Sequence, residues 1–252
     1  MKISIITPSY NQGHFIKETI DSVLNSDYDN IEYIVMDGGS TDNTVDILKS
    51  YGDKIIWKSE KDNGQTDAIN KGMNLATGDI LCFLNSDDYY MADTISYVMD
   101  YFKTNKDAMW LSGDYIIVDE NGNEIQGFVK KYKNLLKSFP NKITLKIANY
   151  IIQPSTFWRR EVFENIGLFD EKLNYVMDYD YWLRTIGKYP LYLTKKKLCS
   201  FRIHGQSKGG FDFSKQFDEE LKICKKYVKN PFVVFLHYIH NLLIVSIYKI
   251  IK

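Results

Sequence analysis

The sequence of 252 residues lacks three common signals of nucleotide or metal binding. It has no G-x-x-x-x-G-K-[ST] phosphate loop, no G-x-G-x-x-G after the first apolar run, and no zinc-type spacing of Cys and His. If the protein binds a nucleotide, the phosphates must therefore be neutralised by another means, such as a cation held by carboxylates.

Cysteine is scarce as well. Cys82, Cys199 and Cys224 are odd in number and widely spaced, which argues against a disulfide framework and indicates a reducing compartment. Residues 1–6 show no charged leader with a long apolar region behind it, so we predict no secretory signal and expect a cytoplasmic location.

Net charge is also absent, because 32 Lys and Arg balance 32 Asp and Glu. A neutral chain offers no electrostatic case for a nucleic-acid partner. Aromatic residues, by contrast, are abundant, with 19 Tyr and 14 Phe. They pack cores and can also contact flat ligands such as bases and sugar rings.

Short β-rich runs alternate with helical patterns in the first part of the chain. The runs cover residues 2–7, 31–36, 54–57 and 80–84. This alternation with short connections predicts an α/β fold with a Rossmann-like, mostly parallel sheet flanked by helices. We predict that residues 1–110 and 111–215 form two halves of one domain and that a helical tail follows at 216–252.

The second half has a different texture. Residues 110–118 and 124–129 flank an Asn-Gly turn and predict a hairpin. Residues 132–150 are basic and predict a helix broken at Pro140. Further on we predict a strand at 153–158, a helix at 160–166, a helix at 175–186, a strand at 191–203 and a mobile loop at 204–210.

Two adjacent carboxylates, Asp87 and Asp88, directly follow the apolar run at 80–84. The polar segments after the first, second and fourth runs should meet at the carboxyl edge of the sheet, where open α/β sheets bind ligands. Neighbouring carboxylates repel, and Mg²⁺ or Mn²⁺ would relieve that repulsion while binding phosphates. The alternative is an acidic N-cap of the next helix.

Two residues at this edge suit a nucleobase. Asp37 can accept a hydrogen bond from an imide N–H such as that of uracil, and Tyr10 can stack on a planar base. With Asp87 they predict a base pocket and a diphosphate clamp on opposite sides of one crevice.

At this point a family resemblance is plain. The blocks that carry it are TPSYN (7–11), VMDGGSTD (35–42), DNGQTDAINKG (62–72), LNSDD (84–88), GLFDE (167–171) and DYDYWLR (178–184). In this order, over residues 3 to about 210, they resemble the family 2 inverting glycosyltransferases of GT-A fold. The resemblance implies Mn²⁺ or Mg²⁺, a nucleotide-sugar donor that is UDP-linked, and a saccharide acceptor. It makes 1–110 the nucleotide-sugar-binding half and 111–215 the acceptor-binding half.

The resemblance also implies roles for residues near the donor. Pro8, Tyr10 and Asp37 would line the uridine pocket, and Asp67 would lie beside it. Where relatives often have a second Asp after Asp37, this chain has Gly38, which leaves Asp37 as the sole acidic residue to contact the base.

The family's Asp-x-Asp motif falls on Asn85, Ser86 and Asp87, so the resemblance makes Asp87 the metal ligand. Asn85 departs from the pattern and would contact the ribose or diphosphate instead, together with Ser86. His204 corresponds to a late histidine that completes the metal or diphosphate site. A lone histidine is otherwise most often structural or on the surface.

Asp178 matches the family's catalytic base. Taken by itself, it could simply cap the helix at 179–186, and Asp180 is another candidate for that cap. In the same block, Trp182 would belong to the core or to an acceptor-site wall, and Arg184 would hold a neighbouring acid.

The segment 231–251 is strongly apolar, but His237, His240 and Asn241 interrupt it, which makes a spanning helix expensive. We expect a helix with a narrow polar stripe that contacts a lipid surface through its apolar side, after the basic residues of 225–229. The alternatives are packing on the domain or on a second copy in a homodimer.

The expected function is metal-dependent transfer of a sugar, with inversion, to a saccharide hydroxyl in the assembly of a cell-surface polysaccharide. A lipid-linked acceptor at the inner face of a bacterial plasma membrane fits the apolar tail. Two alternatives stay open, a sugar-1-phosphate nucleotidyltransferase and a non-catalytic nucleotide- or carbohydrate-binding subunit. The former would usually show a Gly-rich basic loop after the first strand, which residues 8–13 do not offer.

Overall fold

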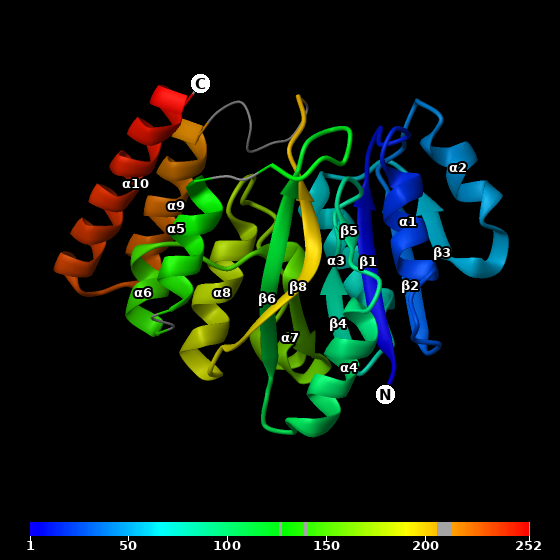
Figure 1. Cartoon of the computed structure of the whole chain (residues 1–252), viewed down its shortest axis with the longest axis horizontal. Helices are drawn as coiled ribbons and strands as arrows, with labels where there is room; N and C mark the ends of the chain where they lie inside the picture. The colour runs from blue at the N-terminus through cyan, green and yellow to red at the C-terminus, as the bar shows by residue number, and fades with distance from the viewer. Residues whose placement is uncertain (126–127, 139–140, 206–212, 252) are drawn as a thin grey trace.

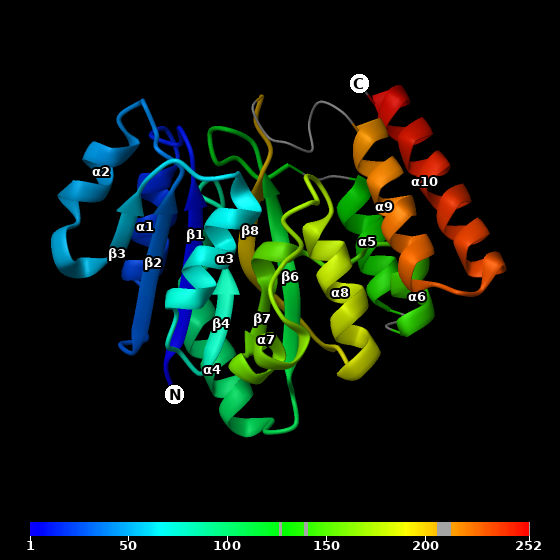
Figure 2. The ribbon, with the colours of Figure 1, turned by 180° about the vertical axis from the view of Figure 1, so that it is seen from behind.

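The computed structural model describes residues 1–125, 128–138, 141–205 and 213–251. These residues form one sheet of eight strands in the order β3-β2-β1-β4-β7-β6-β8-β5, with helices on both faces (Figures 1 and 2). The tail helices lie together at one end of the molecule, beyond the sheet. The α/β prediction is therefore confirmed.

The first half of the sheet is parallel. Its strands are β1 (Ile3–Ser9), β2 (Ile31–Asp37), β3 (Ile56–Ser59) and β4 (Ile80–Phe83). The helices between and after them are α1 (Ile16–Leu24), α2 (Thr44–Ser50), a 3₁₀ turn η1 (Gly52–Lys54), α3 (Gln65–Leu75) and α4 (Thr94–Thr104). Every residue of β1 is buried because helices cover both faces. The carboxyl ends of these strands point to the upper edge in Figure 1.

The second half continues the same sheet with mixed pairing. β7 (Thr156–Arg159) pairs antiparallel with both β4 and β6 (Trp110–Val118). β8 (Tyr192–Arg202) runs parallel to β6, and the short β5 (Tyr89–Tyr90) pairs antiparallel with β8. β8 thus returns the chain to the segment that follows β4.

The predicted hairpin is wrong in its second arm. After β6, only an isolated bridge joins Val118 to Glu124, and the chain then forms helix α5 (Phe128–Lys137). The apolar residues of this stretch recur at helical spacing, and that longer period prevails over a short β-rich run. A helix does follow, at α6 (Lys142–Ile147), while Pro140 lies outside the described residues.

Three stacked tryptophans fix the helix that carries Asp178. Trp182, in α8 (Met177–Lys188), lies 5.8 Å from Trp110 and 5.4 Å from Trp158 between ring centroids, each pair inclined by 24°. All three side chains are fully buried, so Trp182 belongs to the core. Before α8, helix α7 (Arg160–Ile166) ends at Gly167, whose φ of 86° favours glycine.

The chain ends in α9 (Phe213–Tyr227) and α10 (Pro231–Ile251). α10 packs against α6 and α9, and α9 also contacts α8. Within the described ranges, none of the helices combines the length and apolarity needed to cross a membrane.

The strand predicted to start at 153 begins instead with a 3₁₀ turn, η2 (Gln153–Ser155).

Candidate functional site

The loops after β1 and β2 are fastened to each other. The backbone N–H of Asn11 donates to Oγ of Ser40 (2.7 Å), and the N–H of Thr41 donates to Oδ1 of Asn11 (2.8 Å). Asn11 adopts a positive φ of 52°, a conformation that Asn tolerates better than most residues. These contacts bring two of the predicted polar segments together at the carboxyl edge of the sheet.

Asp37 lies at the end of β2 and is 2% exposed. Its Oδ2 accepts hydrogen bonds from the N–H groups of Gly39 and Ser40 and from the hydroxyl of Ser59, and its Oδ1 accepts one from the hydroxyl of Ser40. Asp37 therefore holds the turn that follows β2. Since a carboxylate oxygen has two lone pairs, Oδ1 keeps one for a ligand N–H.

Tyr10 and Pro8 take different positions at the end of β1. The ring of Tyr10 is 59% exposed, as a stacking platform for a base must be, whereas Pro8 is buried within the strand. Of these two side chains, Tyr10 is therefore the one that a ligand can reach, and Pro8 is packed inside the end of the strand.

An acidic residue that sequence reasoning missed lies beside Gly38. A Cβ added at Gly38 would be 2.7 Å from Oδ2 of Asp62, so the carboxylate of Asp62 occupies the space where a larger residue 38 would sit. Asp62 belongs to the DNGQTD block, which was the available signal. Nearby, Asp67 is 7% exposed, and the N–H of Asn63 with Lys71 (3.1 Å) lowers its pKa.

Asn85 connects helix α3 to the second half of the chain. Its Oδ1 accepts a hydrogen bond from the amide of Gln65 (2.8 Å), and its own amide donates to Oε1 of Gln153 (3.3 Å) and Oδ2 of Asp88 (3.2 Å). Ser86 is 5% exposed, and its carbonyl accepts from the hydroxyl of Thr19. The side-chain amide of Asn85 thus donates hydrogen bonds that the carboxylate of an aspartate at this position could not donate.

Asp87 and His204 meet at the other side of this segment. Oδ2 of Asp87 lies 3.0 Å from Nε2 of His204, with the side chains 21% and 4% exposed. Arg202, two residues before His204, donates from Nε to the carbonyl of Asp87 (2.9 Å) and pairs with Glu18. The end of β8 thus holds Asp87 by both its backbone and its side chain.

Asp88 faces inward and has its acceptors engaged. It is 1% exposed, and its carboxylate accepts from the N–H of Arg202 (2.9 Å) and the amide of Asn85. Burial, and then the neighbouring charge of Asp87, raises the pKa of Asp88 well above its ordinary value. The N-cap alternative is wrong for this pair, because the next helix is α4, which begins at Thr94.

The donor set of Asp87 and His204 fits a divalent cation of the Mn²⁺ type. A carboxylate oxygen and an imidazole nitrogen both ligate Mn²⁺, and 3.0 Å between them is close enough for one ion to contact both after a small adjustment. Within the described residues, no group of three or more His, Cys, Asp or Glu side chains forms a cation cage. A cation here would therefore need further ligands from the diphosphate of the donor.

Asp178 lies at the start of α8, next to helix α3. The hydroxyl of Thr66 in α3 contacts Sδ of Met177 (2.8 Å), the residue before Asp178. Asp178 is partly exposed, and its Oδ1 accepts from the N–H of Tyr179 (2.7 Å). The N-cap position of α8 is Val176, so neither Asp178 nor Asp180 is the N-cap.

Burial raises the pKa of Asp178, while Tyr179, Lys133 and Asn149 act in the opposite direction. Sequence reasoning missed two residues whose charges interact with that of Asp178. Lys133 in α5 acts to lower the pKa of Asp178, and Asp178 acts to raise the pKa of Glu220 in α9. Glu220 is 4% exposed, and burial with the charge of Asp178 raises its pKa to about 8. No sequence signal links these residues, because they are 45 and 42 positions from Asp178.

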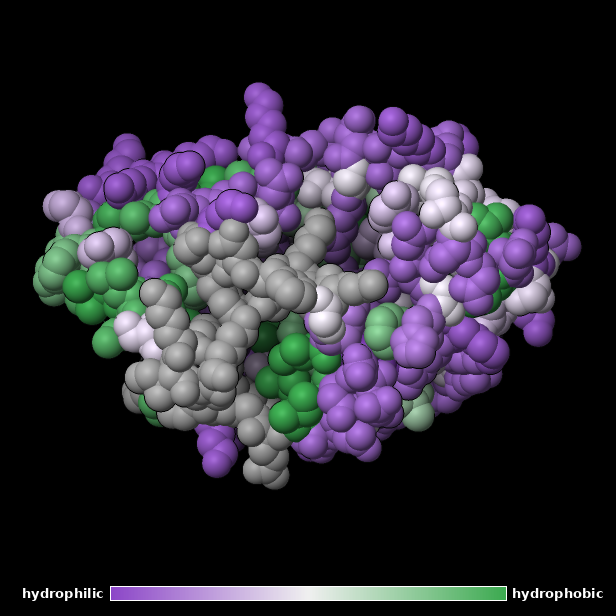
Figure 3. All heavy atoms as spheres, turned by 90° about the horizontal axis from the view of Figure 1, so that it is seen from above, coloured by the Kyte–Doolittle hydropathy of each residue, from purple (hydrophilic) through white to green (hydrophobic). Residues whose placement is uncertain are grey.

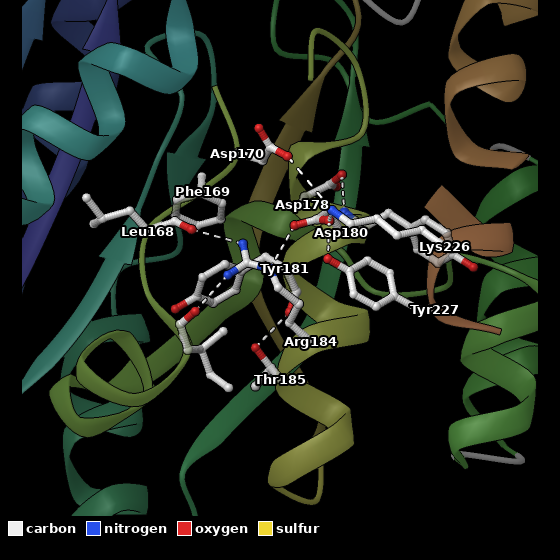
Figure 4. Close-up of polar contacts among 12 residues, drawn as sticks. Leu168, Phe169, Asp170, Asp178, Asp180, Tyr181, Arg184, Thr185, Lys226 and Tyr227 are labelled. Atoms are coloured by element: carbon white, nitrogen blue, oxygen red, sulfur yellow. Dashed lines mark hydrogen bonds and ion pairs between the residues drawn. The ribbon is translucent and has the colours of Figure 1, made fainter. Parts of the chain in front are cut away.

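The carboxylate of Asp180 is bound by side chains of α8 and α9. Figure 4 shows its carboxylate between Arg184, Lys226 and Tyr227. Nε of Arg184 lies 2.8 Å from Oδ2, and the hydroxyl of Tyr227 donates to Oδ1 (2.8 Å). Arg184 also donates to the carbonyls of Ile166 and Leu168. The prediction that Arg184 holds a neighbouring acid is confirmed, and Asp180 ties α8 to the tail.

Two surface hollows, of about 470 and 410 Å³, lie away from these residues. The first is lined by parts of α6, α7 and α8 and the second by α9 and the segment before α8. Neither is lined by Asp37, Asp87 or Asp178. Residues 206–210 of the predicted mobile loop lie outside the described residues.

Comparisons with known sequences agree with this geometry. The family model described as "Glycosyl transferase family 2" matches residues 4–167. An uncharacterized glycosyltransferase of Rickettsia typhi is 33% identical over 205 residues, which are 80% of this chain and 64% of the relative. A PGL/p-HBAD biosynthesis glycosyltransferase of Mycobacterium bovis is 30% identical over 186 residues, 72% of this chain and 68% of the relative. The chain thus spans less than two thirds of the Rickettsia relative.

Solved structures share the fold at low identity. S. aureus TarS in complex with UDP superposes with a TM-score of 0.69 and 20% identity, over 91% of this chain and 66% of that one. The mannosyltransferase PcManGT from Pyrobaculum calidifontis, in complex with GDP-Man and Mn²⁺, gives 0.69 and 16%, over 95% and 73%. At these identities the likeness shows the fold.

Proposed function

The chain belongs to glycosyl transferase family 2, and we propose that it transfers a sugar from a nucleotide sugar to a saccharide hydroxyl with inversion at the anomeric carbon. One observation carries the proposal. The segment Asn85–Asp88 and the start of α8 both contact the start of α3, through Gln65 and Thr66. The proposed diphosphate clamp at Asp87 and the proposed base Asp178 therefore both lie next to residues that contact the same end of α3.

The donor would bind at the ends of β1 and β2. Tyr10 is open for stacking, and Asp37 retains a lone pair for an imide N–H, which favours uracil and a UDP-linked donor. Asp62 and Asp67 add acceptors on the same side. Asn85 and Ser86 would lie against the ribose or diphosphate.

Asp87 and His204 would hold Mn²⁺ or Mg²⁺ together with the donor diphosphate. When bound, such an ion supplies positive charge to the departing diphosphate. Arg202 keeps Asp87 in place through its carbonyl, and Asp88 supports the segment from inside. The proposed clamp thus consists of residues at and just after the end of β8 together with the segment that follows β4.

Asp178 would act as the base. The acceptor oxygen forms a bond to C1 of the sugar while the bond from C1 to the diphosphate oxygen breaks, and the hydroxyl proton moves to the carboxylate of Asp178. Because burial raises the pKa of Asp178, its carboxylate binds that proton more strongly than an exposed aspartate would. No covalent enzyme intermediate is formed, and the single displacement inverts C1.

The acceptor would be a saccharide, and we propose a lipid-linked one in the assembly of a cell-surface glycan. The printed name of the mycobacterial relative places that protein in PGL/p-HBAD biosynthesis.

A screen of nucleotide sugars tests the proposal. With Mn²⁺ present, UDP-glucose, UDP-N-acetylglucosamine, UDP-galactose and GDP-mannose would each be incubated with the full chain, and nucleoside diphosphate release would be measured. Release from at least one donor is expected. Pyrophosphate release from UTP and a sugar 1-phosphate would instead identify a nucleotidyltransferase, and binding without any turnover would identify a binding subunit.

A further inference from the structure

The last helix, α10, is oriented with its polar side toward the protein. His237 is fully buried, and its Nδ1–H donates to the carbonyl of Ile147 in α6 (3.0 Å). Its Nε2 accepts from the amide of Asn241 (3.0 Å), and Oδ1 of Asn241 accepts from His240 (2.9 Å). Burial lowers the pKa of His237 to about 4, so this contact stays uncharged at neutral pH.

The opposite side of α10 is apolar and exposed. The exposed side chains recur at helical spacing and are Phe232 (64%), Phe235 (56%), Tyr238 (45%), Leu242 (45%) and Leu243 (60%). Leu135 of α5 and Ile143 of α6 are exposed beside this helix bundle as well, at 59% and 58%. Figure 3 shows apolar side chains gathered at the end of the molecule where α10 lies. A surface helix normally faces its apolar side to the core, so this arrangement indicates that something covers it.

Charge is segregated toward the same end. Residues 126–158 and 221–252 each contain six Lys and no Asp or Glu, which leaves 20 Lys and Arg against all 32 Asp and Glu in the rest of the chain. These two segments include α5, α6 and α10 and the second half of α9. The net charge of the whole chain is therefore zero, although these two segments are basic and the rest of the chain is acidic.

We propose that α10 docks this basic end of the protein onto an anionic lipid surface. An apolar helix face enters the boundary between headgroups and acyl chains, and lysines beside it attract anionic headgroups. Lys225 and Lys229 are exposed just before the first turn of α10. A second copy of the chain fits less well, because pairing through α10 would bring two basic ends together.

Vesicle co-sedimentation of the full chain tests this proposal. The probes are vesicles of phosphatidylcholine alone and vesicles with about a third phosphatidylglycerol. Binding to the anionic vesicles is expected, weakened by salt and by Lys225→Gln with Lys229→Gln. Leu243→Glu should weaken it at least about tenfold, because a charge replaces buried apolar area. The matched control is Leu75→Glu, at a leucine of α3 that is 53% exposed and far from the tail.

Equal vesicle binding by Leu243→Glu and Leu75→Glu would overturn the proposal, as would equal binding of wild type to both kinds of vesicle. A dimer in analytical ultracentrifugation that Leu243→Glu dissociates, without vesicle binding by wild type, would assign the face to a second copy. Leu243→Glu should hydrolyse a nucleotide sugar in solution at the wild-type rate, so this result is separable from the proposed function.

Discussion

Nε2 of His204 lies 3.0 Å from Oδ2 of Asp87, although 117 positions separate the two residues in the chain. Asp87 follows β4, and His204 follows β8. Arg202 makes the approach possible, because its guanidinium binds the carbonyl of Asp87 and its N–H binds Asp88. The proposed diphosphate clamp therefore depends on the pairing of β5 with β8 as much as on the Asn85–Asp87 motif.

Asp87→Ala should weaken UDP binding in the presence of Mn²⁺ by at least about tenfold, because a carboxylate ligand is lost. His204→Ala should do the same to a smaller extent. Calorimetry with and without Mn²⁺ measures both. The control is Asp53→Ala, at an exposed aspartate in η1. A loss that is equal with and without Mn²⁺ would speak against a metal role for these residues.

Asp178→Asn should lower kcat about 10²- to 10⁴-fold, because the amide cannot accept the hydroxyl proton. UDP affinity should stay within about twofold of wild type, since Asp178 is not assigned to donor binding. Single-turnover kinetics measures the loss of transfer rate, and calorimetry measures the UDP affinity.

Asp180→Asn is the matched comparison two residues away. Because Asp180 is 1% exposed and bound by Arg184 and Tyr227, the change should cost roughly 1–3 kcal/mol of unfolding free energy. Turnover per folded molecule should remain near wild type. If Asp180→Asn abolished transfer and Asp178→Asn did not, the assignment of the base would be reversed.

Glu220 makes stability depend on pH. Its folded pKa of about 8 lies above the ordinary value of 4.5, so the folded state binds the proton more tightly than the unfolded state does. The stabilisation that the protonated Glu220 gives the folded state is complete below the ordinary glutamate pKa of 4.5. It is lost as the pH rises toward about 8. Glu220→Gln should therefore flatten this decline and raise the melting temperature at high pH relative to wild type. Parallel stability curves for the two proteins would show that Glu220 is not buried in its neutral form.

Gly38→Asp should weaken UDP binding, because the new Cβ would lie 2.7 Å from Oδ2 of Asp62 and a second carboxylate would face the first. Adding Asp62→Asn removes the repulsion and should restore part of the affinity. Calorimetric dissociation constants of Gly38→Asp, Asp62→Asn, the double variant and the wild type test the coupling. Additive effects would mean that Asp62 does not constrain residue 38.

The sequence predicted the parallel half of the sheet well, because each buried strand there is a short apolar run bounded by turn residues, as in the segment that ends at Asp37. It failed at α5, where a run too short to separate period 2 from period 3.6 was interpreted as a strand.

Within the site, the contact between the polar loops after β1 and β2 followed from the rule that parallel strands share a carboxyl edge. The engagement of Asp37 by Ser40 and Ser59, and the proximity of Lys133 and Glu220 to Asp178, could not be predicted. These contacts depend on how loops and tail helices pack, and no local pattern encodes that.

The central claim is inverting transfer with Asp178 as the base. The most direct measurement is proton NMR of the sugar product formed from a UDP-linked donor and Mn²⁺, compared between wild type and Asp178→Asn. The account predicts a product of inverted anomeric configuration from wild type and none above background from Asp178→Asn. A product of retained configuration, or equal product from both proteins, would contradict it.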